Sequence, residues 1–429
     1  MKNLNRRNFV KAAASALALP SIIPSSALGL NGAVAPSNRI YMGIIGAGSQ
    51  MEWDWKDISG CKGVQGIAVC DVRRSRRIKF SQIMRLKEKD CYEDYRDLVA
   101  RPDIDAVAVA TPDHNHVHVS IAAMKAGKDV YCEKPLSNTI REGRALVNVA
   151  ERYGTVFQHG TLLHSLPGPH LACELVRNGR LGDVKEIRIG SPAGRSFGWA
   201  PSAPVPPGLN YDLWLGPAPY TPYNPVKVGS IPGQGLHAWY FYSDYSKAGW
   251  IAGYGVHDLD LAQWAIGMER SGPVSIEGHA TYPEDGLFDT PLKFEIVYEY
   301  ANGVRITMTD TSKNRHGVTF LGDNGKWIWT RWGVEANPPS LLRETIGPNE
   351  IHLYKSPGHG QNFVDCIRSR AETITPAEIA HRATSSALLG GIACQLQRKL
   401  RWDPVKEIFP GDDEANRLLQ CAMRAPFQV

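Results

Sequence analysis

The pattern of apolar and polar positions divides the chain after residue 37 into two halves. In the first half, short apolar runs alternate with stretches of helical periodicity. The runs that predict strands are 40–45, 64–69, 106–110, 129–132 and 155–159, and the predicted helices are 117–126 and 140–153. Buried strands that alternate with helices indicate a parallel, doubly wound sheet. We therefore predict an α/β Rossmann domain over residues 37–160.

The pattern changes near residue 160. It predicts a helix at 171–178 and a half-buried strand at 184–190, and the Pro- and Gly-rich stretch 191–235 predicts a long ordered loop. Further alternating runs predict a largely antiparallel sheet, with strands at 274–281, 292–300, 304–309 and 326–330. We expect an α+β substrate and oligomerisation domain with an open sheet over 161–360. A C-terminal helical segment, 361–429, should pack on the domains.

The first 35 residues have the features of an export signal. Adjacent Arg6 and Arg7 precede an apolar pair and Lys11, and an Ala/Leu-rich stretch follows. That stretch is too short for a transmembrane helix, which needs about 20 apolar residues. The arrangement resembles a twin-arginine (Tat) signal. We expect a periplasmic or otherwise exported protein that uses the Tat machinery, has no integral membrane span, and stays at the membrane if the signal is not cleaved.

Composition narrows the possible functions. The formal net charge of +5 is small for 429 residues, and the basic residues form no cluster of the kind that nucleic-acid binding requires. The eight cysteines contain no C-x-x-C pair, and several lie in apolar runs. This predicts buried free thiols rather than a disulfide framework.

A glycine-rich turn after the first predicted strand indicates a dinucleotide site. Gly46 lets the chain turn sharply, and Gly48 lets backbone N–H groups approach a pyrophosphate at a helix N-terminus. Met51 occupies the third glycine position, so we expect looser packing there or a shifted helix. Asp71 closes the next strand, where it can accept both ribose hydroxyls of NAD. Two arginines directly behind it, Arg73 and Arg74, offer a site for a 2′-phosphate, so NADP remains possible.

The sequence TPDHNH (111–116) follows another predicted strand. Parallel strands end at the crevice in which open α/β sheets bind ligands. His114, His116 and His118 suggest a metal site, but no cysteine or carboxylate has suitable spacing, and a helix start would point the three side chains apart. We predict no metal, and assign this stretch to helix capping and nicotinamide-ribose contacts.

The strand 129–132 leads into Glu133, Lys134 and Pro135. A lysine fixed at the end of a buried strand, just before a rigid proline, is placed to act as an acid or a hydrogen-bond donor. That function needs a bound cofactor nearby, and the glycine-rich turn supplies one. Together these features predict dehydrogenase chemistry.

The motifs GIIGAG, the acidic strand end, ATPDHNH and EKP occur in this order. In this respect the chain resembles the Gfo/Idh/MocA oxidoreductases, over nearly everything after residue 37. The resemblance implies a Rossmann domain and a substrate domain whose open sheet often mediates oligomerisation. It therefore implies a homo-oligomer, a dimer or a tetramer.

The resemblance also implies a catalytic pair. The family's EKP lysine corresponds to Lys134, which would hydrogen-bond the reacting hydroxyl or carbonyl. Its D-x-G-x-H-x-x-D pattern falls on residues 253–260, so His257 would be the base in oxidation and the acid in reduction. The first aspartate of the pattern is replaced by Gly253. A histidine already titrates near neutral pH, so we expect the pair to suffice; the alternative is a retuned or inactive site. Asp260 shares the helix face of His257 and could orient it, whereas Asp258 points about 100° away.

An aromatic-rich stretch, 237–250, precedes the proposed catalytic histidine. It suits stacking on the apolar face of a sugar ring, and it equally suits a hydrophobic core or an oligomer interface. The candidate cofactor contacts are Gly46, Gly48, Ser49, Asp71, Thr111, Pro112, His116, Glu133 and Lys134. The candidate substrate contacts are Tyr254, Asp260, Trp239 and His164.

These features predict hydride transfer between a sugar, or sugar derivative, and a tightly bound NAD or NADP. Free nicotinamide cofactor is not expected to be plentiful outside the cytoplasm, so export favours a redox-balanced cycle. One alternative is redox-neutral glycoside cleavage or epimerisation through a keto sugar, in which the ketone acidifies the neighbouring C–H. The other is a non-catalytic sugar-binding protein that keeps the Rossmann frame.

Overall fold

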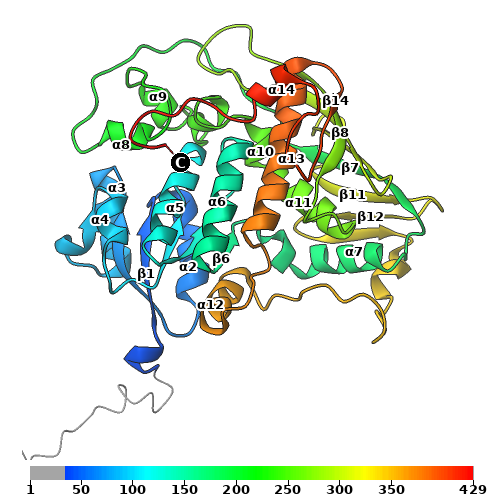
Figure 1. Ribbon diagram of the computed structural model, residues 1–429, viewed down its shortest axis with the longest axis horizontal. Coiled ribbons are helices and arrows are strands. Elements are labelled where there is room, and N and C mark those ends of the chain that lie inside the picture. Colours follow the sequence, from blue (N-terminus) through cyan, green and yellow to red (C-terminus); the bar gives the residue numbers. More distant parts are fainter. Residues whose placement is uncertain (1–33, 429) are drawn as a thin grey trace, which may run out of the picture.

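The computed structural model describes residues 34–428 of the chain (Figure 1). The predicted twin-arginine segment, 1–35, lies outside this range except for its last two residues. Within residues 34–428, no helix is long and apolar enough to cross a membrane.

The first domain is a six-stranded parallel sheet with the order β3-β2-β1-β4-β5-β6, as the alternating pattern predicted. The strands are β1 (Ile40–Ile45), β2 (Val64–Cys70), β3 (Cys91–Tyr92), β4 (Ala106–Val109), β5 (Asp129–Cys132) and β6 (Phe157–His159). The helices are α2 (Ser49–Ser59), α3 (Arg74–Met84), α4 (Tyr95–Val99), α5 (His116–Lys125) and α6 (Ile140–Tyr153). Every residue of β4 and β5 is buried, because helices cover both faces of the sheet.

Local sequence fixes α6 at both ends. The Thr139 hydroxyl accepts from the Glu142 N–H, which caps the helix, and donates to the Glu142 carboxyl at 2.7 Å. At the other end, Gly154 takes a left-handed conformation with φ of 60°. The helix therefore begins directly after the EKP turn and fixes where that turn lies.

The second domain contains an eight-stranded sheet with the order β13-β12-β11-β7-β10-β9-β8-β14. The strands are β7 (Val184–Ser191), β8 (Pro273–Thr281), β9 (Lys293–Tyr300), β10 (Arg305–Asp310), β11 (Gly317–Gly322), β12 (Trp327–Thr330), β13 (Val334–Asn337) and β14 (Leu400–Arg401). Only the β7–β10 pair is parallel among these strands, so the predicted largely antiparallel sheet is confirmed. Burial alternates along β9, because helices cover one face of this sheet only: α7 (Pro167–Arg177) packs on β12 and β13, α11 (Gly255–Ala265) packs on β7 and β11, and α13 (Ala377–Leu396) packs on β8 and β9.

Residues 206–245 cross above α3 and α5 in Figure 1, and we call them the strap. The long loop predicted at 191–235 contains two short helices in this part, α8 (Tyr211–Leu215) and α9 (Pro225–Val228). The strap has an apolar cluster of its own, formed by Leu209, Tyr211, Trp214, Leu215, Ala218, Tyr223, Val228, Trp239 and Tyr245. It is therefore a packed element and not a loose connection.

The C-terminal tail joins the two domains. The predicted C-terminal helical segment contains two longer helices, α12 (His359–Ser369) and α13 (Ala377–Leu396), because Arg370 turns left-handed and Pro376 is the N-cap of the second. Helix α12 packs on α2, whereas α13 packs on α6, α11 and β8. A short helix, α14 (Asp413–Arg417), follows β14, and the Phe427 ring ends beside His118.

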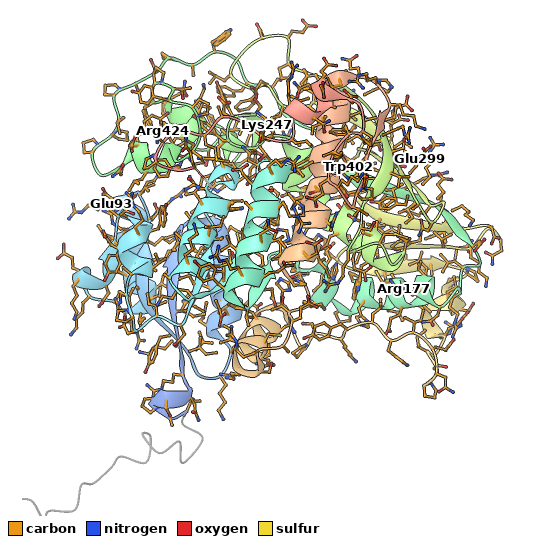
Figure 2. All side chains as sticks on the ribbon, in the orientation of Figure 1. Glu93, Arg177, Lys247, Glu299, Trp402 and Arg424 are labelled. Carbon is orange, nitrogen blue, oxygen red and sulfur yellow. The ribbon has the colours of Figure 1, made fainter. Side chains whose placement is uncertain are left out.

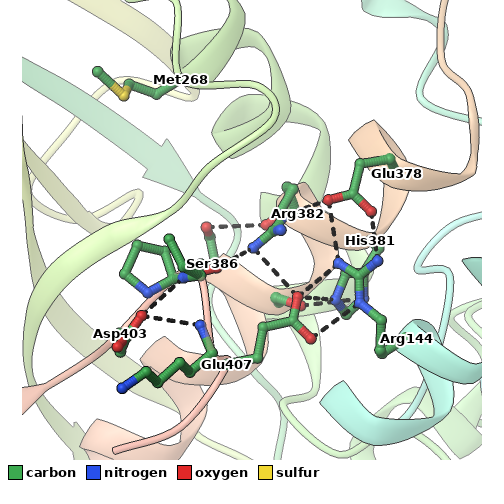
Figure 3. Close-up of polar contacts among 12 residues, drawn as sticks. Arg144, Met268, Glu378, His381, Arg382, Ser386, Asp403 and Glu407 are labelled. Carbon is green, nitrogen blue, oxygen red and sulfur yellow. Dashed lines mark hydrogen bonds and ion pairs between the residues drawn. The ribbon is translucent and has the colours of Figure 1, made fainter.

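An ion network fastens this tail to the Rossmann domain (Figure 3). Arg144, on α6, binds Glu378 of α13 and Glu407 of the following loop, each at 2.7 Å. Glu407 also contacts His381 at 2.7 Å and Arg382 at 3.2 Å. Burial alone would raise the pKa of Glu407, but the hydrogen bonds from His381 and Arg144 hold it well below its usual range. The carboxylate is therefore charged and needs its partners.

We expect Arg144→Ala to lower the free energy of unfolding by about 3 kcal/mol, because it strands Glu407 without its main cation. The folded pKa of Glu407 lies below its unfolded value, so the stabilisation is complete above the ordinary glutamate pKa of about 4.3 and is lost as the pH falls through the folded pKa. Urea unfolding at pH 7 and near pH 2 should show a deficit that shrinks in acid. Arg398→Ala, which removes an exposed pair with Asp412, is the control and should change little; an equal effect of both variants would contradict the network's role.

Candidate active site

The crevice at the carboxyl ends of β1, β2 and β4 is built to receive an anion. Gly46 has φ of +87°, and a Cβ there would lie 2.6 Å from the Ala110 carbonyl oxygen. Gly48 is the N-cap of α2 and supplies no side-chain cap, so the first N–H groups of this helix are open to a phosphate. Met51 is fully buried in the core below the turn. The turn fits the pyrophosphate of a dinucleotide.

Asp71 lies at the end of β2, as predicted, and its carboxylate is already engaged. Its oxygens accept from the N–H groups of Ala47 at 2.8 Å and Arg73 at 2.7 Å, and burial raises its pKa. The nearest guanidinium belongs to Arg76, whose Nη1 lies 3.9 Å from an Asp71 oxygen. The sequence analysis named Arg73 and Arg74 but missed Arg76. Its position in the first turn of α3, beside the end of β2, is the signal that would have found it.

The three histidines of the 111–118 stretch point in different directions. His114 contacts the Trp214 carbonyl at 3.0 Å, and His118 packs between Tyr95 and Phe427. His116 places its ring nitrogens 2.7 Å from the Pro135 carbonyl and 2.8 Å from the Thr111 carbonyl. In residues 34–428 there is no group of three ligands suited to a metal ion.

His116 thus contacts both the Thr111 turn and the EKP turn. It is 1% exposed, and burial lowers its pKa to about 4. Both properties indicate that it positions the two turns rather than touching the cofactor. Thr111 is closer to the crevice, which it lines with Pro112, and its buried hydroxyl oxygen has no partner within the described residues. Such an orphaned atom fits a hydrogen bond to a bound ligand.

Lys134 extends from the end of β5 toward the second domain. Its Nζ donates to the Gly253 carbonyl at 3.2 Å and lies 5.8 Å from the Tyr240 ring and 5.7 Å from the Tyr254 ring. Burial alone would lower the pKa of Lys134, but Tyr240 and the carboxyl of Glu133 raise it above its usual range. Lys134 is therefore a cation with a fixed direction. Glu133 itself is buried behind it and accepts from the Lys134 N–H at 3.2 Å.

An aromatic ring lies beside Gly253, which replaces the first aspartate of the D-x-G-x-H-x-x-D pattern. A Cβ on Gly253 would lie 3.2 Å from two ring carbons of Tyr240, a tight contact. Tyr240 comes from the strap, 13 positions earlier in the chain, and its ring faces the same lysine. Burial raises the pKa of its hydroxyl, so Tyr240 is neutral there. The sequence analysis noted its aromatic stretch but not this substitution of a ring for a carboxylate.

His257 lies in the first turn of α11 and is 6% exposed. Burial, then the positive charges of Lys134 and Arg331, hold its pKa well below the usual range. The expectation that His257 titrates near neutral pH is therefore wrong, because two cations face a buried ring. Its Nδ1 has no hydrogen-bond partner among the described residues. The imidazole is neutral and free to accept a proton.

The two aspartates of the same helix turn away to other partners. Asp258 forms a fully buried ion pair with Arg331, and burial raises its pKa to about 6. An oxygen of Asp260 lies 3.2 Å from Nε2 of His164, although the two are not aligned for a hydrogen bond. His164 in turn stacks on Trp264 at 4.2 Å. Asp260 thus pairs with His164 rather than with His257.

The remaining predicted substrate residues lie on both sides of Lys134. Tyr254 is half-buried beside the lysine. Trp239 is 8% exposed, belongs to the apolar cluster of the strap, and stacks on Tyr240 at 3.8 Å. Tyr254 can therefore reach a ligand directly, whereas Trp239 supports the ring of its neighbour.

Both domains match one family. Residues 40–161 match the oxidoreductase family's NAD-binding Rossmann fold (GFO/IDH/MocA), and residues 174–429 match its C-terminal alpha/beta domain. The chain belongs to the GFO/IDH/MocA oxidoreductase family. The resemblance carried by the four motifs is thereby confirmed, and so is a nicotinamide-binding first domain.

Two relatives of this GFO/IDH/MocA chain are matched over less than half of their length, and one solved structure is matched over nearly all of its length. Levoglucosan dehydrogenase from Pseudarthrobacter phenanthrenivorans is 34% identical over 95 residues, 22% of this chain and 24% of that protein. A glycosyl hydrolase family 109 protein from Shewanella baltica is 30% identical over 174 residues, 35% of this chain and 38% of that protein. Aldose-aldose oxidoreductase from Caulobacter crescentus, solved with glycerol, has a TM-score of 0.63 at 17% identity, over 85% of this chain and 99% of that one. The last match shows the shared fold.

Restoring the family's aspartate should strain this site. We expect Gly253→Asp to lower the free energy of unfolding by about 1–3 kcal/mol, because the new Cβ overpacks the Tyr240 ring. Gly333→Asp is the control, since a Cβ there meets nothing within 4 Å. The double variant with Tyr240→Ala should recover most of the loss. Equal stability of Gly253→Asp and the native chain in urea would show that the ring does not occupy this place.

Proposed function

We propose that this chain transfers hydride between a nicotinamide cofactor and a hydroxyl or ketone of a sugar or sugar derivative. The observation that carries the proposal is a fixed lysine cation, Lys134, at the carboxyl edge of a dinucleotide-binding sheet, whose positive charge acts on a buried, neutral histidine, His257. The sugar class is supported by the levoglucosan dehydrogenase and aldose-aldose oxidoreductase among the relatives.

Lys134 and His257 have different roles in the proposed reaction. The nicotinamide, when bound by the glycine turn, Asp71 and Thr111, supplies or accepts the hydride. Lys134 donates a hydrogen bond to the reacting oxygen and stabilises the negative charge that develops on it. His257 takes the hydroxyl proton in oxidation and returns it in reduction. The rings of Tyr254 and Tyr240 both lie near the Lys134 ammonium group and would limit the space open to the sugar.

We also propose where the protein acts and how it keeps its cofactor. We infer an exported protein, through the Tat machinery, that keeps its NAD or NADP tightly bound and returns it to its starting redox state within one cycle. The twin arginines support export, and a relative named for paired aldose chemistry supports the balanced cycle. The half-exposed charged face of β9 leaves room for a homo-oligomer through the open sheet.

The second candidate is redox-neutral glycoside cleavage or epimerisation through a keto sugar. The family 109 glycosyl hydrolase among the relatives favours it, and so does the state of His257. A neutral imidazole whose Nδ1 has no partner within residues 34–428 is suited to removing the acidic C–H proton next to a ketone. Both candidates begin with the same hydride step, and a protein that only binds sugar would show no such step.

Lys134→Ala should lower the rate of hydride transfer by about 10²–10³-fold, the usual loss for one preorganised donor, and should leave bound cofactor in place. The measurement is a single-turnover rise in reduced-nicotinamide absorbance on adding sugars, together with mass spectrometry of the cofactor that co-purifies. Lys185→Ala, at an exposed lysine of β7, is the control. An empty native chain, or a Lys134→Ala variant with native rates, would refute the enzyme assignment.

The pH profile should report the low pKa of His257. A base is active in its deprotonated form, so the rate of sugar oxidation should stay level as the pH falls through about 6.5, the ordinary histidine value, and should drop only below it. His257→Gln should lose about 10²–10⁴-fold in rate and lose this acid limb. A half-maximal rate at the ordinary value in the native chain would mean that burial and the charges of Lys134 and Arg331 do not lower the pKa of His257.

A further inference from the structure

The first arm of the strap is fastened beside the acidic end of β2. The Asn210 N–H donates to the Val72 carbonyl at 3.0 Å, and the Gly208 carbonyl accepts from the Arg74 N–H at 2.8 Å. The Asn210 side chain donates to Glu93 at 2.8 Å, and Glu93 is labelled at the left of Figure 2. The strap therefore begins its path next to Asp71, where the cofactor's adenosine half would lie.

The strap then covers the crevice itself. Leu213 and Trp214 line one pocket together with Gly46, Asp71 and Thr111. The Trp214 carbonyl accepts from the Asn115 amide at 2.9 Å. From the tail, Arg424 donates to the Gly216 carbonyl at 3.1 Å and pairs with Asp212, which fixes this arm from above (Figure 2).

The second arm returns to the glycine turn. His237 places Nε2 3.1 Å from the Ser49 hydroxyl, across 188 positions of sequence. Ser49 is the first residue of α2 and is exposed, next to the uncapped N-terminus of that helix. Arg76 faces the same turn, because its Nη1 lies 3.5 Å from the Cβ position of Gly48. Two basic side chains and a helix N-terminus thus converge where a phosphate would bind.

An aromatic stack continues from this point to the reacting end. The rings of His237 and Trp239 are 6.1 Å apart with an angle of 22°, and those of Trp239 and Tyr240 are 3.8 Å apart with an angle of 29°. The Tyr240 ring then faces Lys134. One short stretch of strap therefore spans from the glycine turn to the catalytic lysine.

We propose that His237 is a contact for the cofactor's pyrophosphate, contributed by the second domain, and that through it the strap retains the dinucleotide in the crevice. A phosphate at the turn would take hydrogen bonds from His237 Nε2, the Ser49 hydroxyl and the first N–H groups of α2. Release of the cofactor then requires the His237 end of the strap to lift from Ser49. This inference rests on the proposed function, since it needs a nicotinamide cofactor.

Competition with bound NADH tests the phosphate contact on the full chain. ADP carries the pyrophosphate and adenosine does not, and each displaces NADH in a fluorescence titration. His237→Ala should weaken ADP about tenfold and speed NADH release about tenfold, as expected for one lost hydrogen bond to a charged group, while adenosine competes as before. His237→Gln keeps a donor and should restore most of the difference. His279→Ala, at an exposed histidine of β8, is the matched control and should behave as the native chain.

The outcomes separate this inference from the proposed function. Equal weakening of ADP and adenosine in His237→Ala would overturn it, because His237 would then only fasten the strap. Unchanged ADP competition and NADH release would overturn it as well. If His237→Ala does not fold, His237→Phe gives the same comparison, because it keeps a ring on Trp239 and has no donor. A native chain that binds neither NADH nor ADP would overturn the proposed function and this inference with it.

Discussion

The positive charge of Lys134 is the constraint on which the rest of the site depends. The side chain leaves the end of β5 at a half-buried position between two domains, where burial alone would favour the neutral amine. The carbonyl of Gly253, the Tyr240 and Tyr254 rings and the carboxyl of Glu133 keep it charged. These groups come from the first domain, the strap and the start of α11. The two domains must therefore hold one relative position for the lysine to keep its charge.

The same charge determines the state of His257. With Lys134 and Arg331 both facing it, the buried ring stays neutral. An aspartate at position 253 would pair with the lysine and favour the protonated imidazole, whereas the Tyr240 ring adds no formal charge. With a neutral ring in place of a carboxylate, the pKa values of the two groups therefore lie further apart. Lys134 stays protonated and can donate, and His257 stays unprotonated and can accept. Such divergent environments are how one site assigns acid and base roles to neighbouring residues.

The sequence alone predicted those features that depend on short stretches of chain. The apolar runs located the strands around Gly46 and Asp71, and the EKP turn located Lys134. β11 and β13 were missed because they contain only three and two apolar residues, too few to establish a period. The partners Tyr240 and Arg331 were missed for a different reason. They reach the site from the strap and from the loop after β12, and no local pattern encodes such long-range contacts.

Retention of a cofactor and a redox-balanced reaction are physically connected. The strap is fastened beside Asp71, at Asn115 and at Ser49, so a dinucleotide bound beneath it would touch both domains. A cofactor that cannot leave in each turnover has to recover its starting redox state within the same crevice. Lys134 and a neutral His257 suit that demand, because the ring can take a proton in one half-reaction and return it in the next while the lysine holds the oxygen in both. Tight retention then favours a second sugar, or the same sugar after rearrangement, as the acceptor of the hydride.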